Sequence, residues 1–225
     1  MSSTFLTLKT AVSRDLRDPT NLFFSTTDVG DLINAALSEV GRIAPYRFQE
    51  DITPVTNAMS YQPQTTVFST PTAEIEIKRV ELWDTSYTPY KFLYTLIPAS
   101  GAYVNTSAAG WECWGGIIYI NNVVENYIDP TKHILRVQGY RPYAPLVNDS
   151  DVNSASPELE AAMRVYARVE ALQRIAFSRD AFTQWQTASN NLNVTPASIL
   201  SELTLALADW ERRAKHLQVL RVASS

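Results

Sequence analysis

The 225-residue sequence is poor in the residues that mark most enzymes, metal proteins and membrane proteins. Its single cysteine, Cys113, cannot form an intramolecular disulfide. Its two histidines, His133 and His216, lie in no zinc spacing and near no nucleophile-elbow motif. The glycine pair at 115–116 lacks the spacing of a phosphate loop and predicts a hairpin turn. No apolar run approaches membrane-spanning length, so we expect a soluble protein that is made in the cytoplasm and does not contact a membrane. Since the motifs of enzymes and metal sites are missing, we also expect that it is not an enzyme and binds no cofactor or metal.

An excess of positive charge is also missing. The formal net charge is -4, whereas a protein that coats DNA is normally basic. Residues 49–152 hold 6 basic and 11 acidic side chains, so the acidic excess lies in the middle of the chain. Hydrophobic residues make up 45% and charged residues 19% of the sequence, which is typical of a folded globular protein.

Residues 1–48 predict a helical hairpin. Phe5, Leu8, Val12 and Leu16 recur at three- and four-residue spacing, which places them on one helical face. Residues 18–21 break this helix. A second helix then begins at a capping-box pattern, residues 25–28, and continues as an apolar stripe with Val29, Leu32, Ile33, Ala36, Leu37 and Val40.

Residues 49–152 change to short β-type runs separated by turn residues, which indicates an antiparallel sheet or sandwich. Residues 153–225 return to helix, with Ser156 as an N-cap and Pro157 at the first helical position. We therefore predict an α+β fold in which a bundle of N- and C-terminal helices carries an inserted antiparallel β subdomain. The expected ranges are 1–48, 49–152 and 153–225.

The last helix predicts two kinds of surface. Apolar residues at three- and four-residue steps form a seam for packing against another helix, made of Leu200, Leu203, Leu207, Trp210, Ala214 and Leu217. Its C-terminal half is basic, with Arg212, Arg213, Lys215, His216 and Arg221. This basic end is either a solvated face that complements the helix dipole or a docking surface for an acidic partner, and charge alone does not separate the two.

Two patterns of carboxylates resemble sites of known chemistry. Asp149, Asp151, Asn153 and Glu160 match four positions of a calcium-binding loop, but Ser154 replaces its turn glycine. We therefore favour an acidic segment before the N-terminus of the following helix over a calcium site. Paired carboxylates at 74 and 76 can in principle do acid–base chemistry, but on a solvated strand face they more often serve solubility.

Aromatic residues are concentrated in the predicted β region. Trp83, Trp111, Trp114 and Tyr119 suit core packing and contacts with other subunits or neighbours. A carbohydrate- or host-binding face is the alternative, and it requires exposed, coplanar rings. A small hydrolase is a third possibility, and it would need one of the two histidines beside a nucleophile.

The two helical ends resemble a known family. Residues 6–18 (LTLKTAVSRDLRD) and 24–37 (FSTTDVGDLINAAL) look like the start of the head–tail adaptor proteins of long-tailed actinobacterial and related phages. Residues 179–186 (RDAFTQWQ), 189–191 (SNN), 195–197 (TPA) and 210–213 (WERR) resemble the closing helices of that family. A helical scaffold with a β insertion is also similar to the "tail tubular A"-like adaptors of short-tailed phages.

This resemblance implies a structural virion protein of the head–tail connector, or neck. It implies a homo-oligomeric ring, usually a dodecamer, that lies beneath the portal protein and extends the DNA channel toward a stopper or tail-completion protein. It also implies that the C-terminal segment docks on the portal, which here would be residues 200–221. An acidic protein suits such a conduit, because genomic DNA must pass through it without sequence-specific binding.

Overall fold

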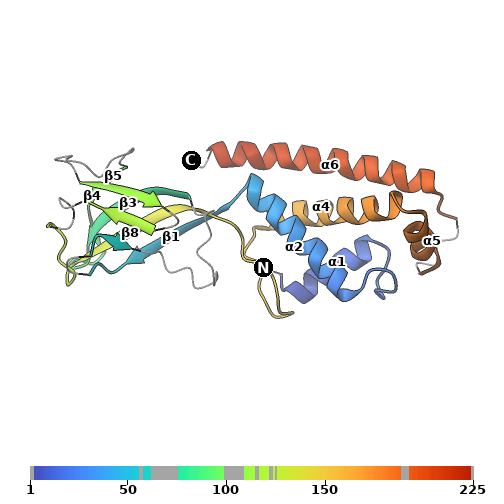
Figure 1. Ribbon diagram of the computed structural model, residues 1–225, viewed down its shortest axis with the longest axis horizontal. Helices are drawn as coiled ribbons and strands as arrows, with labels where there is room; N and C mark the ends of the chain where they lie inside the picture. The colour runs from blue at the N-terminus through green and yellow to red at the C-terminus, as the bar shows by residue number, and fades with distance from the viewer. Residues whose placement is uncertain are drawn as a thin grey trace. The chain divides into compact units, whose positions relative to one another are not determined.

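The computed structural model has an α+β fold, as predicted (Figure 1). It describes residues 3–55, 58–61, 76–98, 109–114, 117–121, 124, 126–188 and 193–223, with the side chains of 219–223 left out. These ranges contain five helices and eight strands, and none of the described helices is long and apolar enough to cross a membrane. The chain divides into a helical unit, Met1–Pro45 with Pro145–Ser225, and a β unit, Tyr46–Ala144.

The helical unit is built from both ends of the chain. Its helices are α1 (Phe5–Asp15), α2 (Thr26–Ile43), α4 (Pro157–Ala176), α5 (Arg179–Ala188) and α6 (Pro196–Ala223). Helix α4 packs against α2 on one side and α6 on another, so a C-terminal helix forms the centre of the bundle (Figure 1). Its core includes the fully buried Leu8, Leu32, Ile33, Ile175 and Ile199.

Local capping decides where these helices begin. Ser25 and Asp28 form the expected capping box, in which the Ser25 hydroxyl accepts from the Asp28 N–H and the Asp28 carboxylate accepts from the Ser25 N–H. The Ser25 hydrogen bonds hold the pKa of Asp28 below its usual value. Ser156 caps α4 and accepts from the Leu159 N–H, with Pro157 at the first helical position, as predicted.

The loop between α1 and α2 is organised by a buried carboxylate. Asp18 is only 2% exposed and accepts hydrogen bonds from the backbone N–H groups of Leu22, Phe23 and Phe24 at 2.8, 3.0 and 2.8 Å. The residues on either side of this turn, Arg17 and Asn21, have φ angles of 60° and 53°. The carboxylate therefore stabilises a turn that the backbone alone disfavours.

The β unit consists of two four-stranded sheets. The first has the order β1 (Tyr46–Ile52), β8 (His133–Arg141), β3 (Glu76–Asp84) and β4 (Lys91–Thr95), with antiparallel pairing throughout. The second has the order β2 (Ser60–Tyr61), β7 (Ile117–Ile120), β6 (Gly110–Trp114) and β5 (Ile97–Pro98), in which only the β5–β6 pair is parallel. The predicted turn at 115–116 lies outside the described residues, but Trp114 pairs with Ile117 on either side of it.

A single apolar core joins the two sheets into a sandwich. The first sheet contributes Val80, Leu82, Leu135 and Val137 to this core, and the second sheet contributes Tyr61, Trp111, Ile118 and Ile120. At Gly139 the neighbouring strands approach so closely that a Cβ atom would collide with the Glu76 carbonyl oxygen and would lie 3.1 Å from the Phe48 ring. The register of β3 shifts between Ile77 and Arg79 opposite this glycine.

The edges of the two units differ from the ranges expected from the sequence. Strand β1 begins at Tyr46, and the segment 145–152 belongs to the helical unit. The N–H groups of Phe5 and Leu6 donate to the carbonyl groups of Asp151 and Asp149. The Asn34 side chain exchanges two hydrogen bonds of 2.9 Å with the backbone of Leu146. Backbone hydrogen bonds therefore tie this segment to the start of α1, and the Asn34 side chain ties it to α2.

Candidate interaction surfaces

The predicted seam of α6 lies mainly inside the bundle. Leu203, Trp210 and Leu217 are buried, Leu207 is half-buried, and only Leu200 is largely exposed. The Trp210 ring meets Tyr166 of α4 edge to face, with 4.8 Å between the ring centroids. The seam thus packs α6 against α4, and Leu200 is its most accessible member. Leu205, which does not belong to the seam, is a second exposed apolar side chain of this helix.

The basic end of α6 is held in place by an acidic side chain of the same helix. Asp209 accepts from Arg212 at 2.6 Å and from Arg213 Nε at 3.0 Å. The hydrogen bond from Arg212, with that from Arg213, holds the pKa of Asp209 below its usual value. Lys215 and His216 are exposed, and the side chain of Arg221 lies outside the described residues. The arginines are therefore orientated and still accessible to solvent.

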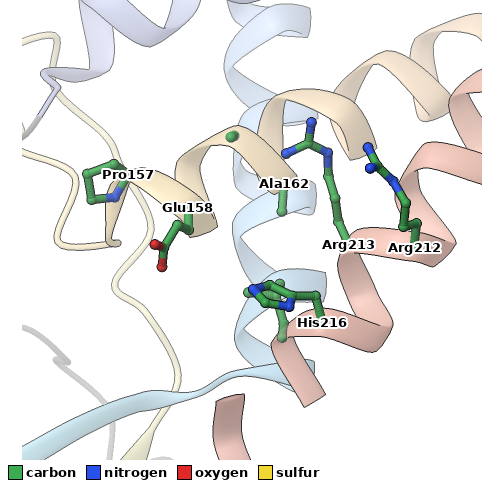
Figure 2. Close-up of a pocket in the computed structure, with 8 residues that line it drawn as sticks. Pro157, Glu158, Ala162, Arg212, Arg213 and His216 are labelled. Atoms are coloured by element: carbon green, nitrogen blue, oxygen red, sulfur yellow. The ribbon is translucent and has the colours of Figure 1, made fainter. Parts of the chain in front are cut away.

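A groove of about 620 Å³ separates the start of α4 from this basic end (Figure 2). Helix α4 contributes Pro157, Glu158, Ala161 and Ala162, and α6 contributes Arg212, Arg213, His216 and Leu217. Sequence reasoning identified the α6 residues but missed their α4 neighbours, because the two sets are some fifty residues apart in the chain. The small residues Ala161 and Ala162, one helical turn into α4, were the only local feature of the sequence that could have indicated the groove.

The four aromatic residues predicted as contact residues fall into different environments. Trp111 is 6% exposed and belongs to the sandwich core, whereas Trp114 is 67% exposed and its indole N–H donates to Glu112 at 2.7 Å. Trp83 and Tyr119 are half-buried. Trp111 offers no exposed ring, so the carbohydrate-binding alternative would have to use Trp114 or the exposed tyrosines of the β unit, which include Tyr87, Tyr90 and Tyr127.

Trp83 is part of a polar network on the outer face of the first sheet. Arg136 forms two hydrogen bonds with Asp51, of 2.7 and 2.8 Å, and its guanidinium lies 4.2 Å from the Trp83 ring centroid. The Asp51 hydrogen bond raises the pKa of Arg136 above its ordinary value. The Trp83 indole N–H donates to Glu81, which also pairs with Arg79 at 2.6 Å. This network connects β1, β8 and β3, and it covers one face of the indole ring.

The residues of the calcium-like pattern make other contacts. Asp149 pairs with Lys9 at 2.9 Å, and the Asp151 carboxylate accepts from the backbone N–H groups of residues 147 and 148. Glu160 accepts from the Ser3 hydroxyl at 2.8 Å. Within the described part of the chain, no three His, Cys, Asp or Glu side chains converge as metal ligands would. Glu74 lies outside the described residues.

Each unit contains one of the two histidines. The N–H of Asp129 donates to Nδ1 of His133 at 3.0 Å, which stabilises the turn before β8. His216 lines the groove at the end of α6.

The sequence was compared with known protein families and with curated proteins. A family model described as SU10 adaptor protein matches residues 3–216, nearly the whole chain. No curated protein matches the sequence significantly. The match covers both helical ends and the β insertion, and it agrees with the resemblance to phage head–tail adaptors. The chain therefore belongs to the SU10 adaptor protein family, whose members are structural adaptor proteins of bacteriophage virions.

Proposed function

We propose that this adaptor forms a homo-oligomeric ring of about twelve copies beneath the portal protein, in the neck of the virion. The ring extends the DNA channel and presents a surface to the stopper or tail-completion protein. The observation that carries this proposal is the family match over residues 3–216. The protein acts by binding and not by catalysis.

The helical unit supports a docking role for the end of α6. Arg212, Arg213, Lys215 and His216 are gathered there, and Asp209 fixes two of them. Because the seam residues Leu203 and Trp210 are buried in the bundle, the portal would contact the basic end and the exposed Leu200. Such side chains can bind an acidic surface without opening the bundle.

The charge of the chain supports passage of DNA without binding. The net charge of -4 repels the phosphate backbone, and release of counterions gives no attraction when the wall of a channel carries like charge. We therefore expect that the protein does not shift a DNA duplex in an electrophoretic assay at physiological salt.

The proposal is tested by mixing the purified protein with portal rings and measuring co-sedimentation, followed by mass measurement of the complex. We expect rings of adaptor on the portal, and removal of residues 212–225 should leave a folded protein that sediments alone. Full portal binding by the truncated protein would overturn the docking role of α6. A complex in which the adaptor stays monomeric would overturn the ring.

A further inference from the structure

We propose that the groove between α4 and α6 binds an acidic, apolar peptide segment of a partner virion protein. The groove is defined by Pro157, Glu158, Ala161 and Ala162 on α4 and by Arg212, Arg213, His216 and Leu217 on α6. The inference deepens the docking role proposed for α6 and rests on it for the class of partner.

The first argument is the shape and chemistry of the floor. Ala161 and Ala162 are small, and Leu217 is buried beside them, so the groove between the two helices is open and largely apolar. Its volume of about 620 Å³ lies within the range of typical ligand sites. An apolar side chain of a peptide would bury itself here and displace water from the half-buried Ala161, whereas Ala162 and Leu217 are already buried.

The second argument is the charge of one wall. Arg212, Arg213 and His216 reach the groove from α6, and Ala162 lies between them and the first turn of α4 (Figure 2). Asp209 compensates one of the two guanidinium charges and contacts one nitrogen of each arginine. Further N–H groups of both guanidinium groups can therefore donate to a carboxylate of a partner. Because Asp209 already orientates these side chains, binding costs less side-chain entropy.

The opposite wall selects the class of ligand. Glu158 stands at the α4 end of the groove, where its carboxylate would repel a continuous chain of phosphates. A nucleic acid carries a charge at every residue and has no aliphatic side chain for the alanine floor. A peptide can place a carboxylate at the arginines and an apolar residue on the floor. The groove therefore favours a protein segment over DNA.

The test uses two seven-residue peptides, Glu-Ala-Leu-Asp-Ala-Leu-Glu and its counterpart Lys-Ala-Leu-Lys-Ala-Leu-Lys, and a single-stranded DNA oligonucleotide. Each is titrated into isotope-labelled full-length protein, and amide chemical shifts are followed. We expect the acidic peptide to bind with a dissociation constant of about 0.1–1 mM. It should shift amides in the first turns of α4 and at residues 209–217.

Two variants locate the binding. R212Q/R213Q should weaken acidic-peptide binding at least tenfold, and A161L, which fills the groove, should weaken it similarly. The control R14Q/R42Q removes the same charge from exposed positions on α1 and α2 and should bind the acidic peptide like the wild type. Arg42 forms an i,i+3 ion pair with Glu39 that is comparable to the pair of Arg212 with Asp209.

Several results would overturn the inference. They are no shifts at millimolar peptide, equal binding of the lysine peptide or the oligonucleotide, and unchanged binding by R212Q/R213Q. Loss of binding in R14Q/R42Q to the same degree would also overturn it, since it would indicate nonspecific attraction. Peptide binding in the groove without co-sedimentation with portal would support the groove and refute the portal as its partner, so the two failures are distinguishable.

Discussion

Replacement of Asp18 should destabilise the helical unit more than replacement of any exposed carboxylate. The Asp18 side chain is 2% exposed and satisfies three consecutive backbone N–H groups, those of Leu22, Phe23 and Phe24. The side-chain oxygen of Asn21, in the same loop, already accepts from the Ser13 hydroxyl at 2.6 Å. The perturbation is Asp18→Ala, with Asp18→Asn as the isosteric variant.

The magnitude follows from the exposure of the three donors. The hydrogen bond from Phe24 is buried, and those from Leu22 and Phe23 are partly buried. A hydrogen bond to a charged group contributes about 1.5–3 kcal/mol, and a donor that water can reach loses less. Asp18→Ala should therefore lower the free energy of unfolding by about 3–5 kcal/mol. Asp18→Asn keeps one acceptor oxygen and should cost about 1–2 kcal/mol, because its amide must face at least one backbone donor.

The assay is urea unfolding followed by circular dichroism, combined with hydrogen exchange of the Phe24 amide. Exchange reports the loop directly and does not require the two units to unfold together. Asp31→Asn, on the exposed face of α2, serves as the control and should leave both measurements unchanged. If Asp18→Ala costs under about 1 kcal/mol with Phe24 still protected, the buried carboxylate is not what orders the turn.

Further predictions concern pH, an ion-pair network and strand packing. Burial raises the pKa of Tyr143 to about 12, so its neutral phenol favours the folded state. The contribution of this phenol to the free energy of unfolding is fully present below its unfolded-state pKa of about 10, and it is lost as the pH rises toward 12. Tyr143→Phe should therefore reduce the fall in melting temperature above about pH 10. Glu202→Gln should cost about 1 kcal/mol in low salt and less in high salt, because Glu202 pairs with both Arg17 and Arg168 at 3.0 Å on a partly exposed surface; Glu211→Gln is the control. Gly139→Ala should cost more than about 2 kcal/mol in thermal unfolding of the β unit, because its Cβ would collide with the Glu76 carbonyl oxygen. In Gly110→Ala the nearest atoms would lie 3.3 Å or more from the new Cβ, so an equal loss there would contradict the backbone collision at Gly139.

The sequence by itself determined the α+β class and the starts of the main helices. These features depend on residues within one helical turn of one another. Ser25 with Asp28, and Ser156 with Pro157, define helix starts through hydrogen bonds that are local in the chain. The helical ends also carried the family resemblance, which the match over residues 3–216 confirmed.

The tertiary structure decided what the periodicity of α6 could not. A repeat of Leu203, Leu207 and Trp210 predicts a packing face, but it does not say whether that face meets the same chain or a partner; here it meets α4. The groove beside Arg213 likewise needs Ala161 from a distant helix. Such contacts depend on how whole elements pack, and packing is decided by the sum of many side chains far apart in the sequence.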